Sequence, residues 1–415
     1  MTRVLLILPT GTYRAPDFVR AAAALDAEVV VASEHRQAMA AAMADRALVV
    51  ALGRPAAAAQ AIVELAGRRP LDAVVAVDDQ GLQAAALAAE QLGLAHNPPQ
   101  AVAATRDKAR ARTVLAAAGV AQPDFRVVGP GDDVAAAAAA VGLPCVVKPV
   151  SLSGSRGVIR ADDPAAAAGA VARVRAILDD AGEDPGGPVL VEAFVPGAEV
   201  ALEGLLRGGT LEVLAVFDKP DPLDGPFFEE TLYITPSRLE PPVRREVVAL
   251  VQEAAGALGL AEGPVHAEVR VGPGPACLIE MAARSIGGLC ARALRFGAGI
   301  SLEEVILRHA LGLDLDGLAR EGAASGVLML PIPGSGVLEE VGGLDAARAV
   351  PGVEGVELTI TRGRPVRALP EGDRYLGFAF ARGATPGDVE TSLRRVQSAL
   401  DIRIAPPEPA NPPKS

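Results

Sequence analysis

The sequence predicts a multidomain protein that combines the α/β and α+β classes, and three observations lead to this prediction. At 415 residues the chain is too long for one ordinary hydrophobic core, so two to four domains are expected. Over residues 1–97, short β-branched runs alternate with alanine-rich helical stretches, which is typical of a parallel sheet. From about residue 326 the pattern changes to short strands and turns, which favours a small C-terminal α+β domain.

The N-terminal α/β domain is predicted from four apolar runs that are typical of buried strands. They lie at residues 4–8, 28–33, 47–52 and 72–79. The domain ends near residue 97, where an Asn-Pro-Pro sequence breaks the regular pattern. Asp78 and Asp79 follow the fourth strand, and open α/β sheets bind ligands at the carboxyl ends of their strands. Capping of the next helix by Asp79 explains this residue equally well, so both interpretations stay open.

The rest of the chain is divided by its strand and helix patterns. We expect a central domain over residues 98–325, with a mobile lid subdomain at about 123–191 that contains strands around an alanine-rich helix. The C-terminal domain is expected over residues 326–405. Residues 406–415 are rich in proline and are expected to be disordered.

Composition excludes several classes of function. The formal net charge of −12 argues against a surface that binds nucleic acid or an acidic membrane. The three cysteines have no Cys-x-x-Cys spacing, which fits a reducing compartment without disulfides. No apolar run approaches the roughly 20 residues that span a bilayer. We therefore expect a soluble, cytoplasmic protein with no nucleic-acid or membrane partner.

The use of lysine is unusual and points to individual residues. Lys and Arg together number 39, yet only four of them are lysines: Lys108, Lys148, Lys219 and Lys414. A chain that uses arginine for ordinary positive charges keeps a lysine where a compact ammonium is needed. Lys414 belongs to the predicted tail. The other three lysines are therefore candidates for binding or catalysis.

A loop of serine and glycine follows Lys148, which itself ends an apolar run. In SLSGSRGV, residues 151–158, glycines allow close approach of the backbone, and N–H and hydroxyl groups can surround phosphate oxygens. The loop matches neither the Walker A pattern nor GxGxxG, and a plain hairpin turn explains it about as well. An ammonium at such a loop supplies the counter-charge for phosphate, so the presence of Lys148 favours a phosphate-binding interpretation.

Two carboxylates are expected to face each other in a hairpin at residues 265–288. The turn GPGPA is centred on Gly274, and a hairpin symmetric about Gly274 places Glu268 opposite Glu280. Like charges at opposed positions repel each other, and a divalent cation between them removes the conflict. Oxygen ligands completed by phosphates are typical of Mg²⁺. The alternative is a pair of solvated glutamates on an exposed hairpin face.

Two further segments carry candidate residues. Arg284 follows Glu280 by four positions, and a guanidinium beside a metal–phosphate site can hold developing negative charge. Residues 191–204 place Glu192, Glu199 and Glu203 around a Pro-Gly turn, where carboxylates could accept from adenine or ribose. His266 next to Glu268 is a poor ligand signature. The sequence contains no pattern typical of a catalytic triad or a zinc cluster.

Taken in order, these motifs resemble those of the ATP-grasp superfamily over about residues 1–405, and most closely its L-amino-acid ligase and carboxylate–amine ligase branch. RDKARAR resembles the segment with the first nucleotide lysine, Lys108, and CVVKP resembles the strand with the second, Lys148. The resemblance implies further ATP contacts from the loop and the hinge strand: Ser153, Gly154, Ser155, Gly157, Glu192, Phe194, Val195 and Glu199. It also implies a biotin-carboxylase-like architecture whose central domain is an ATP-grasp fold.

The resemblance extends to the metal and the substrates. HAEV and LIEMAAR resemble the two metal strands, which makes Glu268 and Glu280 ligands of one or two Mg²⁺ ions, or of Mn²⁺ in their place. Arg284 matches the arginine near the reacting acyl group. Many members have asparagine where this chain has Ala282, which affects the expected coordination of a second metal ion.

The expected reaction has two steps. ATP phosphorylates a carboxylate to an acyl phosphate, and an amine then displaces phosphate to form an amide. The segment that begins at Lys219, expected to be catalytic, is placed on the substrate side, with Phe227 as a further pocket candidate. The expected substrate residues are Phe228, Glu229, Gly287 and Gly288. The carboxylate and the amine themselves are not defined by the sequence.

Four other functions remain to be separated from this one. A biotin-carboxylase-like enzyme would activate bicarbonate, and a kinase-like member would stop at phosphate transfer. A nucleotide-binding regulatory protein would lack catalysis, which the retained lysines and glutamates argue against. An NAD-binding dehydrogenase is disfavoured because PTGTYRAP, not GxGxxG, follows the first strand. By analogy with the family, a homodimer is one expected assembly.

Overall fold

The computed structural model describes residues 2–35 and 44–406. Residues 407–415, which include most of the predicted tail and Lys414, lie outside the described residues. The chain divides into two compact units. The first unit comprises Met1–Gln122, Val200–Val216 and Leu239–Gly322, and the second comprises Pro123–Glu199, Phe217–Arg238 and Ala323–Ser415. The four contiguous segments expected from the sequence therefore stay predictions.

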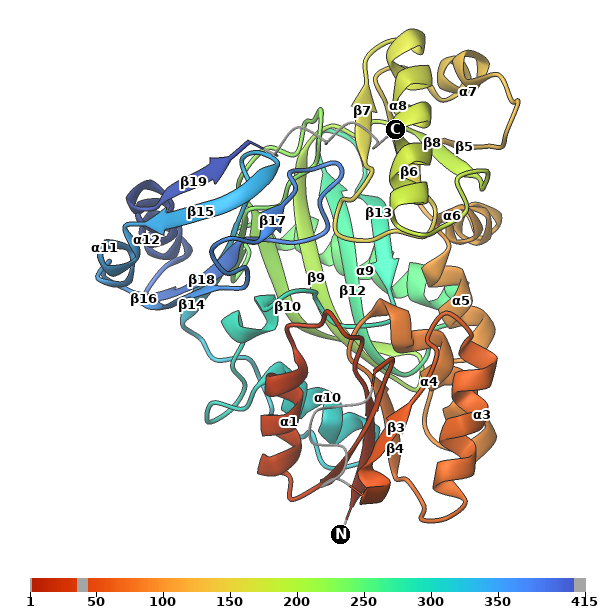
Figure 1. The fold of residues 1–415 in the computed structure, drawn as a ribbon, viewed down its shortest axis with the longest axis vertical. Coiled ribbons are helices and arrows are strands. Elements are labelled where there is room, and N and C mark those ends of the chain that lie inside the picture. Colours follow the sequence, from red (N-terminus) through yellow and green to blue (C-terminus); the bar gives the residue numbers. More distant parts are fainter. Residues whose placement is uncertain (1, 36–43, 407–415) are drawn as a thin grey trace, which may run out of the picture. The chain divides into compact units, whose positions relative to one another are not determined.

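The first unit begins with a parallel sheet, as the sequence predicts. Its strands are β1 (Arg3–Ile7), β2 (Glu28–Ser33), β3 (Ala47–Val49) and β4 (Ala73–Ala76), in the order β3-β2-β1-β4. The helices are α1 (Ala15–Ala24), α3 (Pro55–Ala66) and α4 (Asp79–Leu92), and η1 (Ala44–Arg46) is a short 3₁₀ helix. Figure 1 shows α1 on one side of this sheet and α3 and α4 on the other. Because both faces are covered, the strands are continuously apolar rather than alternating.

Helices and antiparallel strands complete the first unit. The helices are α5 (Pro99–Arg106), α6 (Lys108–Ala117), α9 (Pro241–Leu258) and α10 (Leu302–Ala310), and η2 (Cys290–Ala293) is a 3₁₀ helix. The strands are neighbours in the order β13 (Cys277–Ala282), β12 (Gly263–Val271), β9 (Ala198–Arg207) and β10 (Thr210–Lys219). Both β9 and β10 contribute residues to each of the two units. Apolar side chains of α5, α6 and α9 pack with those of the strands into one core.

The second unit contains a small antiparallel sheet within the segment predicted as a lid. Its order is β5 (Phe125–Val128), β8 (Val189–Ala193), β6 (Cys145–Pro149) and β7 (Ile159–Ala161). Helices α7 (Val134–Val141) and α8 (Pro164–Asp180) share an apolar core with these strands. The side chains of Asp133 and Asp163 cap these two helices by accepting backbone N–H bonds.

The C-terminal part of the second unit is built of antiparallel strands and two helices. β11 (Leu232–Thr235), β14 (Ala324–Leu330), β18 (Gly377–Gly383) and β16 (Val353–Leu358) are successive neighbours. A three-stranded sheet has the order β17 (Pro365–Val366), β15 (Gly336–Gly342) and β19 (Asp401–Ala405). α11 (Leu344–Arg348) and α12 (Pro386–Ala399) pack with these strands around a second apolar core. This is the α+β organisation that the change of pattern near residue 326 predicts.

A loop of this C-terminal part contacts the glycine-rich loop and helix α8. The N–H of Gly157 donates to the carbonyl oxygen of Pro370 at 2.9 Å. The guanidinium of Arg173 on α8 donates to both carboxylate oxygens of Glu371, at 2.7 and 3.0 Å. The Asp180 carboxylate accepts from Arg156 at 2.8 Å and also from Arg367. Residues 367–371 therefore hold the segment that the sequence predicts to be mobile.

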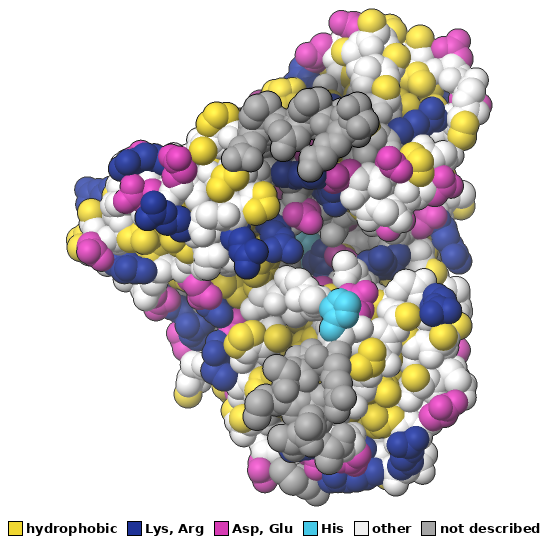
Figure 2. Space-filling view, in the orientation of Figure 1, with side chains coloured by type: hydrophobic (Ala, Val, Ile, Leu, Met, Phe, Trp, Pro, Cys, Tyr) yellow, Lys and Arg dark blue, Asp and Glu magenta, His cyan; other side chains and the backbone are white. Residues whose placement is uncertain are grey.

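On the face of the molecule that Figure 2 draws, neither positive nor negative side chains alone cover the surface. Lys and Arg side chains are mixed there with Asp and Glu side chains. Among the described residues, no helix is both long enough and apolar enough to cross a bilayer.

Candidate active site

The two glutamates predicted to bind metal face each other in the first unit. β12 and β13 form an antiparallel hairpin in which Glu268 is paired with Glu280, and His266 with Ala282. The register shifts by one residue after Glu268, where Val269 pairs with Leu278. The symmetric hairpin expected from the sequence is therefore confirmed at the two glutamates and wrong nearer the turn. The bulge increases the local twist and re-aims neighbouring side chains.

Helix α6 holds Lys108 against the second of these glutamates. Lys108 is the first residue of α6, and the ammonium Nζ lies 3.3 Å from Oε1 of Glu280. Arg112, one turn further along, is buried and donates to the carbonyl oxygens of Leu278 and Ile279 at 3.2 and 2.6 Å. Asp107 caps the same helix by accepting the N–H of Arg110. The position of Lys108 is thus fixed by the backbone of the strand that carries Glu280.

Arg284 is bound by an aspartate at the carboxyl end of β4. Nη2 of Arg284 lies 2.9 Å from Oδ2 of Asp79, and the two side chains are 13% and 21% exposed. Burial disfavours both charges, but their attraction more than offsets it, so the pKa of Asp79 is lowered and that of Arg284 is raised. Helix α4 begins at Asp79 itself, and its N-cap residue is Asp78. Asp79 is therefore not the N-cap residue of α4, and its carboxylate is bound to Arg284.

A chain of three side chains connects strand β12 to the loop after β13. The imidazole Nδ1 of His266 contacts the Glu203 carboxylate, and Nε2 lies 3.5 Å from Glu268. Glu203 also accepts the backbone N–H of Ile286 at 2.9 Å. Burial lowers the pKa of His266, but the two carboxylates more than offset this effect and raise it to about 9. His266 is therefore an imidazolium at neutral pH and orients Glu268.

In the second unit, Lys148 has a carboxylate partner. Its Nζ lies 2.5 Å from Oε2 of Glu192 on the neighbouring strand, and the two side chains are 5% and 4% exposed. The register of β6 and β8 places Lys148 opposite Leu190 and Glu192 opposite Val146. The sequence identified both residues as nucleotide contacts but did not show that each is the partner of the other.

The serine–glycine loop joins β6 to β7, and its residues 154–157 form a turn. Gly154, Ser155 and Gly157 have positive φ angles of 66°, 57° and 74°. A left-handed conformation is costly for a serine, so Ser155 is a genuine exception among the non-glycine residues. A Cβ atom at Gly157 would lie 3.1 Å from the ring of Pro149. Gly157 is therefore needed both for its φ angle and for close packing. Ser153, the fourth predicted residue, lies in the same loop.

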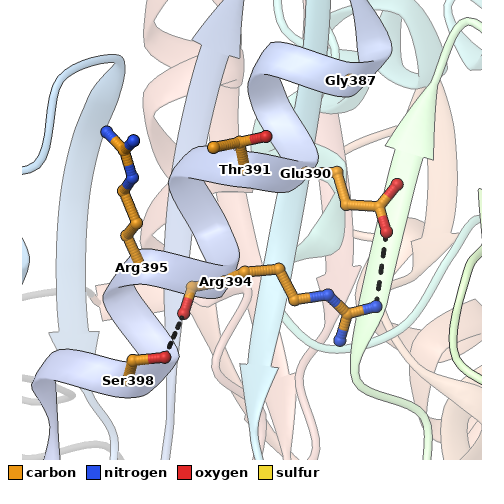
Figure 3. A pocket seen from close by; sticks show the side chains of 6 residues that line it. All are labelled: Gly387, Glu390, Thr391, Arg394, Arg395 and Ser398. Carbon is orange, nitrogen blue, oxygen red and sulfur yellow. Dashed lines mark hydrogen bonds and ion pairs between the residues drawn. The ribbon is translucent and has the colours of Figure 1, made fainter.

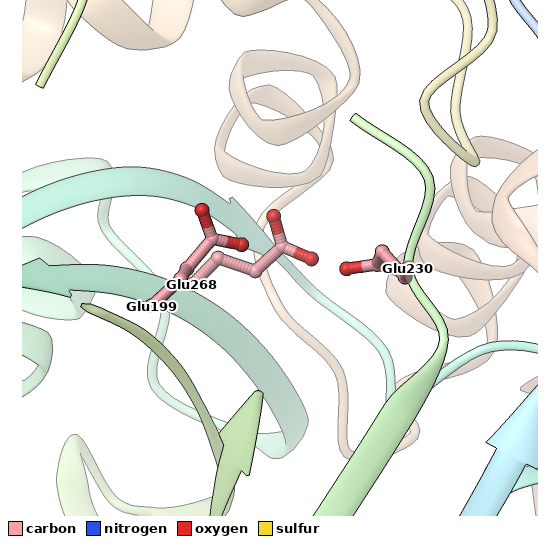
Figure 4. Close-up of side chains that lie close together, drawn as sticks. All are labelled: Glu199, Glu230 and Glu268. Atoms are coloured by element: carbon pink, nitrogen blue, oxygen red, sulfur yellow. The ribbon is translucent and has the colours of Figure 1, made fainter. Parts of the chain in front are cut away.

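Lys219, expected to be catalytic, ends β10 and is buried among acidic groups. Nζ lies 2.7 Å from Oε1 of Glu199 and also contacts the carboxylate of Glu230. Figure 4 shows these two carboxylates. The hydroxyl of Tyr233 donates to Glu230 at 2.6 Å, and the ammonium lies 4.9 Å from the centre of the tyrosine ring. The sequence did not identify Glu230 as a partner of Lys219. Glu230 lies three residues before Tyr233, which belongs to strand β11, and this position is the one hint that the sequence contains.

The predicted pocket residues Phe227, Phe228 and Glu229 lie between β10 and β11. Phe228 lies 6.4 Å from the ring of Phe194, a predicted adenine contact that follows β8. Phe227 packs against the core of β5–β8 and bridges Ile159. Burial raises the pKa of Glu229, and the N–H of Ile332 offsets part of this effect. Phe227 is thus a packing residue of the lid, while Phe228 and Glu229 stay candidates for substrate contact.

The remaining predicted residues lie in loops. Val195 follows Phe194, and Gly287 and Gly288 lie in the turn after β13, where Gly288 has a φ angle of 59°. Another hollow, along α12, is shown in Figure 3. It is lined by Gly387, Glu390, Thr391, Arg394, Arg395 and Ser398. All of these come from one helix, and Arg394 is already paired with Asp221 and Glu390, so this hollow gives no argument for a site.

Comparisons with known proteins agree with this geometry. Family models match an ATP-grasp N-terminal domain at residues 19–96, an ATP-grasp domain at 141–293 and an L-amino acid ligase C-terminal domain 2 at 328–405. The crystal structure of an L-amino acid ligase from Bacillus licheniformis has a TM-score of 0.81. It is 26% identical and is aligned over 98% of this chain and 99% of that one.

Two kinds of curated relative are ligases. A D-alanine–D-alanine ligase of Cupriavidus taiwanensis is 30% identical over 55% of this chain and 70% of its own length. The alanine–anticapsin ligase of Bacillus subtilis is 28% identical over 59% of this chain and 55% of its own length. A Sinorhizobium fredii protein, y4rH, is 28% identical over 74% of this chain. The chain spans 63% of the length of that protein and 55% of the alanine–anticapsin ligase.

The first unit places Lys108 and Arg284 with the opposed glutamates of an antiparallel hairpin. The second unit pairs Lys148 with Glu192. The chain belongs to the ATP-grasp family, and within it to the L-amino-acid ligase branch. The fold class predicted from the sequence is confirmed.

Proposed function

We propose that this protein is an ATP-dependent carboxylate–amine ligase that joins amino-acid-like substrates. In the first step a substrate carboxylate oxygen attacks the γ-phosphorus of ATP, which gives an acyl phosphate and ADP. In the second step the amine attacks the acyl carbon, phosphate leaves, and the amine loses a proton. The observation that carries this proposal is the opposed pair Glu268 and Glu280 with Lys108 and Arg284, in a chain of the L-amino-acid ligase branch.

The residues of the first unit fit the phosphate and metal chemistry. Glu268 and Glu280 offer hard carboxylate oxygens from opposed positions, which is the donor type that Mg²⁺ prefers. Bound there, Mg²⁺ would neutralise phosphate charge, and Mn²⁺ offers the same chemistry. The ammonium of Lys108 is held for the phosphates, and the guanidinium of Arg284 for charge that develops on the acyl group. Ala282 offers no ligand atom, so we propose that one ion is bound more firmly than any second ion.

The residues of the second unit fit nucleotide binding. Lys148 offers an ammonium, and Ser153 and Gly154 offer backbone N–H groups, for phosphate oxygens. Gly157 contributes through its positive φ angle, because its own N–H already donates to Pro370. We assign the nucleotide base to the Glu192–Val195 segment and a ribose hydroxyl to Glu199. Lys219 lies between the carboxylates of Glu199 and Glu230, so its charge is compensated until an anionic substrate arrives.

Amine-dependent release of ADP and phosphate tests the proposed reaction. Purified protein is incubated with ATP, Mg²⁺ and amino acids, singly and in pairs, and products are identified by mass spectrometry. Hydroxylamine serves as a general amine because it traps an acyl phosphate as a hydroxamate. A phosphorylated product without amide would support the kinase-like alternative. Turnover that depends on bicarbonate would support the biotin-carboxylase-like one, and no turnover with the whole panel would support a regulatory protein.

Glu280→Gln tests the metal assignment separately. The variant keeps the size of the side chain but removes one anionic ligand, so we expect the Mg²⁺ concentration for half-maximal activity to rise at least tenfold. Glu253→Gln, on the exposed face of α9 in the same unit, is the matched control. An unchanged Mg²⁺ dependence in Glu280→Gln would remove this residue from the metal site. The cytoplasmic location and the homodimer stay predictions, which cell fractionation and light scattering can test.

A further inference from the structure

A cavity of about 110 Å³ lies in the first unit beside β4. β4 is the edge strand of the N-terminal sheet, and Val74, Val75 and Ala76 form one wall of this β4 cavity. Helix α4 contributes a second wall that includes Leu82 and Ala86, which are 8% and 5% exposed. These two walls are therefore apolar and rich in alanine, whereas the rest of the lining includes polar side chains such as Glu262 and His309.

One end of the β4 cavity reaches the candidate active site. Arg284 and Ser285 line it, and both lie at the carboxyl end of β4. Arg14 marks this end, because its guanidinium donates to the carbonyl oxygen of Val77 at 2.9 Å and to the hydroxyl of Ser285 at 2.7 Å. The cavity thus runs along β4 toward the arginine that we assign to the acyl group.

Further polar groups line the cavity, from the segments around Asn97, Glu262 and His309. Asn97 donates to the carbonyl oxygen of Glu262, and the N–H of Gly263 donates to Nε2 of His309 at 3.0 Å. These groups bond to one another, and burial lowers the pKa of His309, with the nearby Glu262 offsetting part of this effect. The imidazole is therefore neutral at physiological pH, and this part of the lining offers no net cation for a second carboxylate.

The size and chemistry of the space select a kind of ligand. Protein interiors leave few voids larger than a water molecule. An apolar cavity of about 150 Å³ stays dry and holds a benzene molecule, so a cavity of this size suits an aliphatic chain of about three or four carbons. Arg284 has five N–H donors and spends one on Asp79 and one on the carbonyl oxygen of Ser285. Donors therefore remain for a carboxylate at the same end.

We propose that the β4 cavity binds the aliphatic side chain of the amino acid whose carboxylate is activated, with that carboxylate at Arg284. The inference rests on the proposed ligase function and names the substrate class of that site. It places leucine-sized side chains among the preferred substrates. Alanine leaves the space unfilled, and phenylalanine exceeds it.

The test compares substrate preference in variants of one helix. Hydroxamate formation is measured with hydroxylamine as the amine and with alanine, leucine or phenylalanine as the carboxylate. Ala86→Leu fills the cavity and is expected to lower kcat/KM for leucine relative to alanine by at least tenfold, which is the usual effect of a methylene-sized misfit. Its unfolding temperature is not expected to fall, because the new side chain occupies empty space.

Leu82→Ala and Leu87→Ala form a matched pair. Leu82 lines the cavity, whereas Leu87 on the same helix packs with the N-terminal core. We expect Leu82→Ala to raise the relative rate with phenylalanine at least tenfold, and Leu87→Ala to leave the preference unchanged. Wild-type activity with the same preference in Ala86→Leu and Leu82→Ala would overturn the cavity assignment alone. No hydroxamate from any amino acid with the wild-type protein would instead overturn the proposed function, and this inference with it.

Discussion

The ion pair between Asp79 and Arg284 leads to a sharp prediction about catalysis. Asp79→Asn keeps the shape of the side chain but removes the charge that holds the guanidinium. Both side chains are largely buried, and the joining distance is 2.9 Å. Hydrogen bonds to charged groups contribute about 1.5–3 kcal/mol in such positions. At about 1.4 kcal/mol for each factor of ten in rate, we expect kcat/KM for amide formation to fall about 10- to 150-fold.

The neighbouring residue provides a matched control. Asp78→Asn makes the same chemical change one position earlier, where the side chain forms no capping hydrogen bond to α4. The charge of Asp78 also acts on Arg284, but less strongly than that of Asp79, so we expect a clearly smaller loss of activity in this variant. Asp79 has a lowered pKa, so its contribution to stability is present above the ordinary value of 3.8 and is lost only as the pH falls through its lower folded pKa. A difference in kcat/KM between these variants and wild type at neutral pH therefore reports on Arg284, because Asp79 does not titrate there.

The assay separates a positioning role from a loss of folding. Initial rates of hydroxamate formation give kcat and KM for the carboxylate, and circular dichroism gives the unfolding temperature. A displaced Arg284 lowers kcat, whereas the KM for ATP stays within a factor of two. Equal rates in the Asp79→Asn and Asp78→Asn proteins would refute the idea that Asp79 positions the arginine.

Two further predictions concern the other buried charges. Glu192→Gln removes the carboxylate that neutralises the buried ammonium of Lys148, which is expected to lower the free energy of unfolding by about 3–5 kcal/mol. The double variant Lys148→Met with Glu192→Leu is expected to recover most of the unfolding temperature while still losing ATP affinity. Equal unfolding temperatures in the single and the double variant would contradict this prediction. The pKa of His266 is raised from 6.5 to about 9, so its stabilisation is complete below pH 6.5 and is lost as the pH rises through about 9, on the order of 3 kcal/mol. Thermal unfolding in chelator from pH 6 to 9.5 checks this, and an identical loss in His266→Gln would show that another group is responsible.

Local patterns were sufficient to predict the residues that share one hairpin or one strand. The alternation around Gly274 placed Glu268 opposite Glu280, because side-chain direction and register follow from a short turn. The scarcity of lysine identified Lys108, Lys148 and Lys219, and each of them contacts a carboxylate in the structure. Composition and strand periodicity were therefore sufficient to identify these residues as charged groups that form contacts with other charged groups.

The partners that come from distant segments could not be predicted in the same way. His266 and Glu203 are 63 positions apart, and their contact depends on which strands become neighbours. Strand order is a property of the whole fold and leaves no mark in the period of one strand. Glu230 is only 11 positions from Lys219, but their contact depends on the path of an irregular loop between β10 and β11, which no periodic pattern describes. The bulge after Glu268 was missed because one unpaired residue hardly changes an apolar pattern.

The contacts of residues 367–371 have a consequence for protein engineering. Members of a family with a separately matched C-terminal domain invite the exchange of that segment as if it were an independent module. Here, removal of the C-terminal segment would leave the N–H of Gly157 without the carbonyl oxygen of Pro370, and Arg173 without Glu371. A chimera that keeps the serine–glycine loop, residues 151–158, of one parent and takes residues 326–405 from another would bring together two contact surfaces that are not matched to each other. The smallest exchangeable cassette is therefore discontinuous and must include both segments.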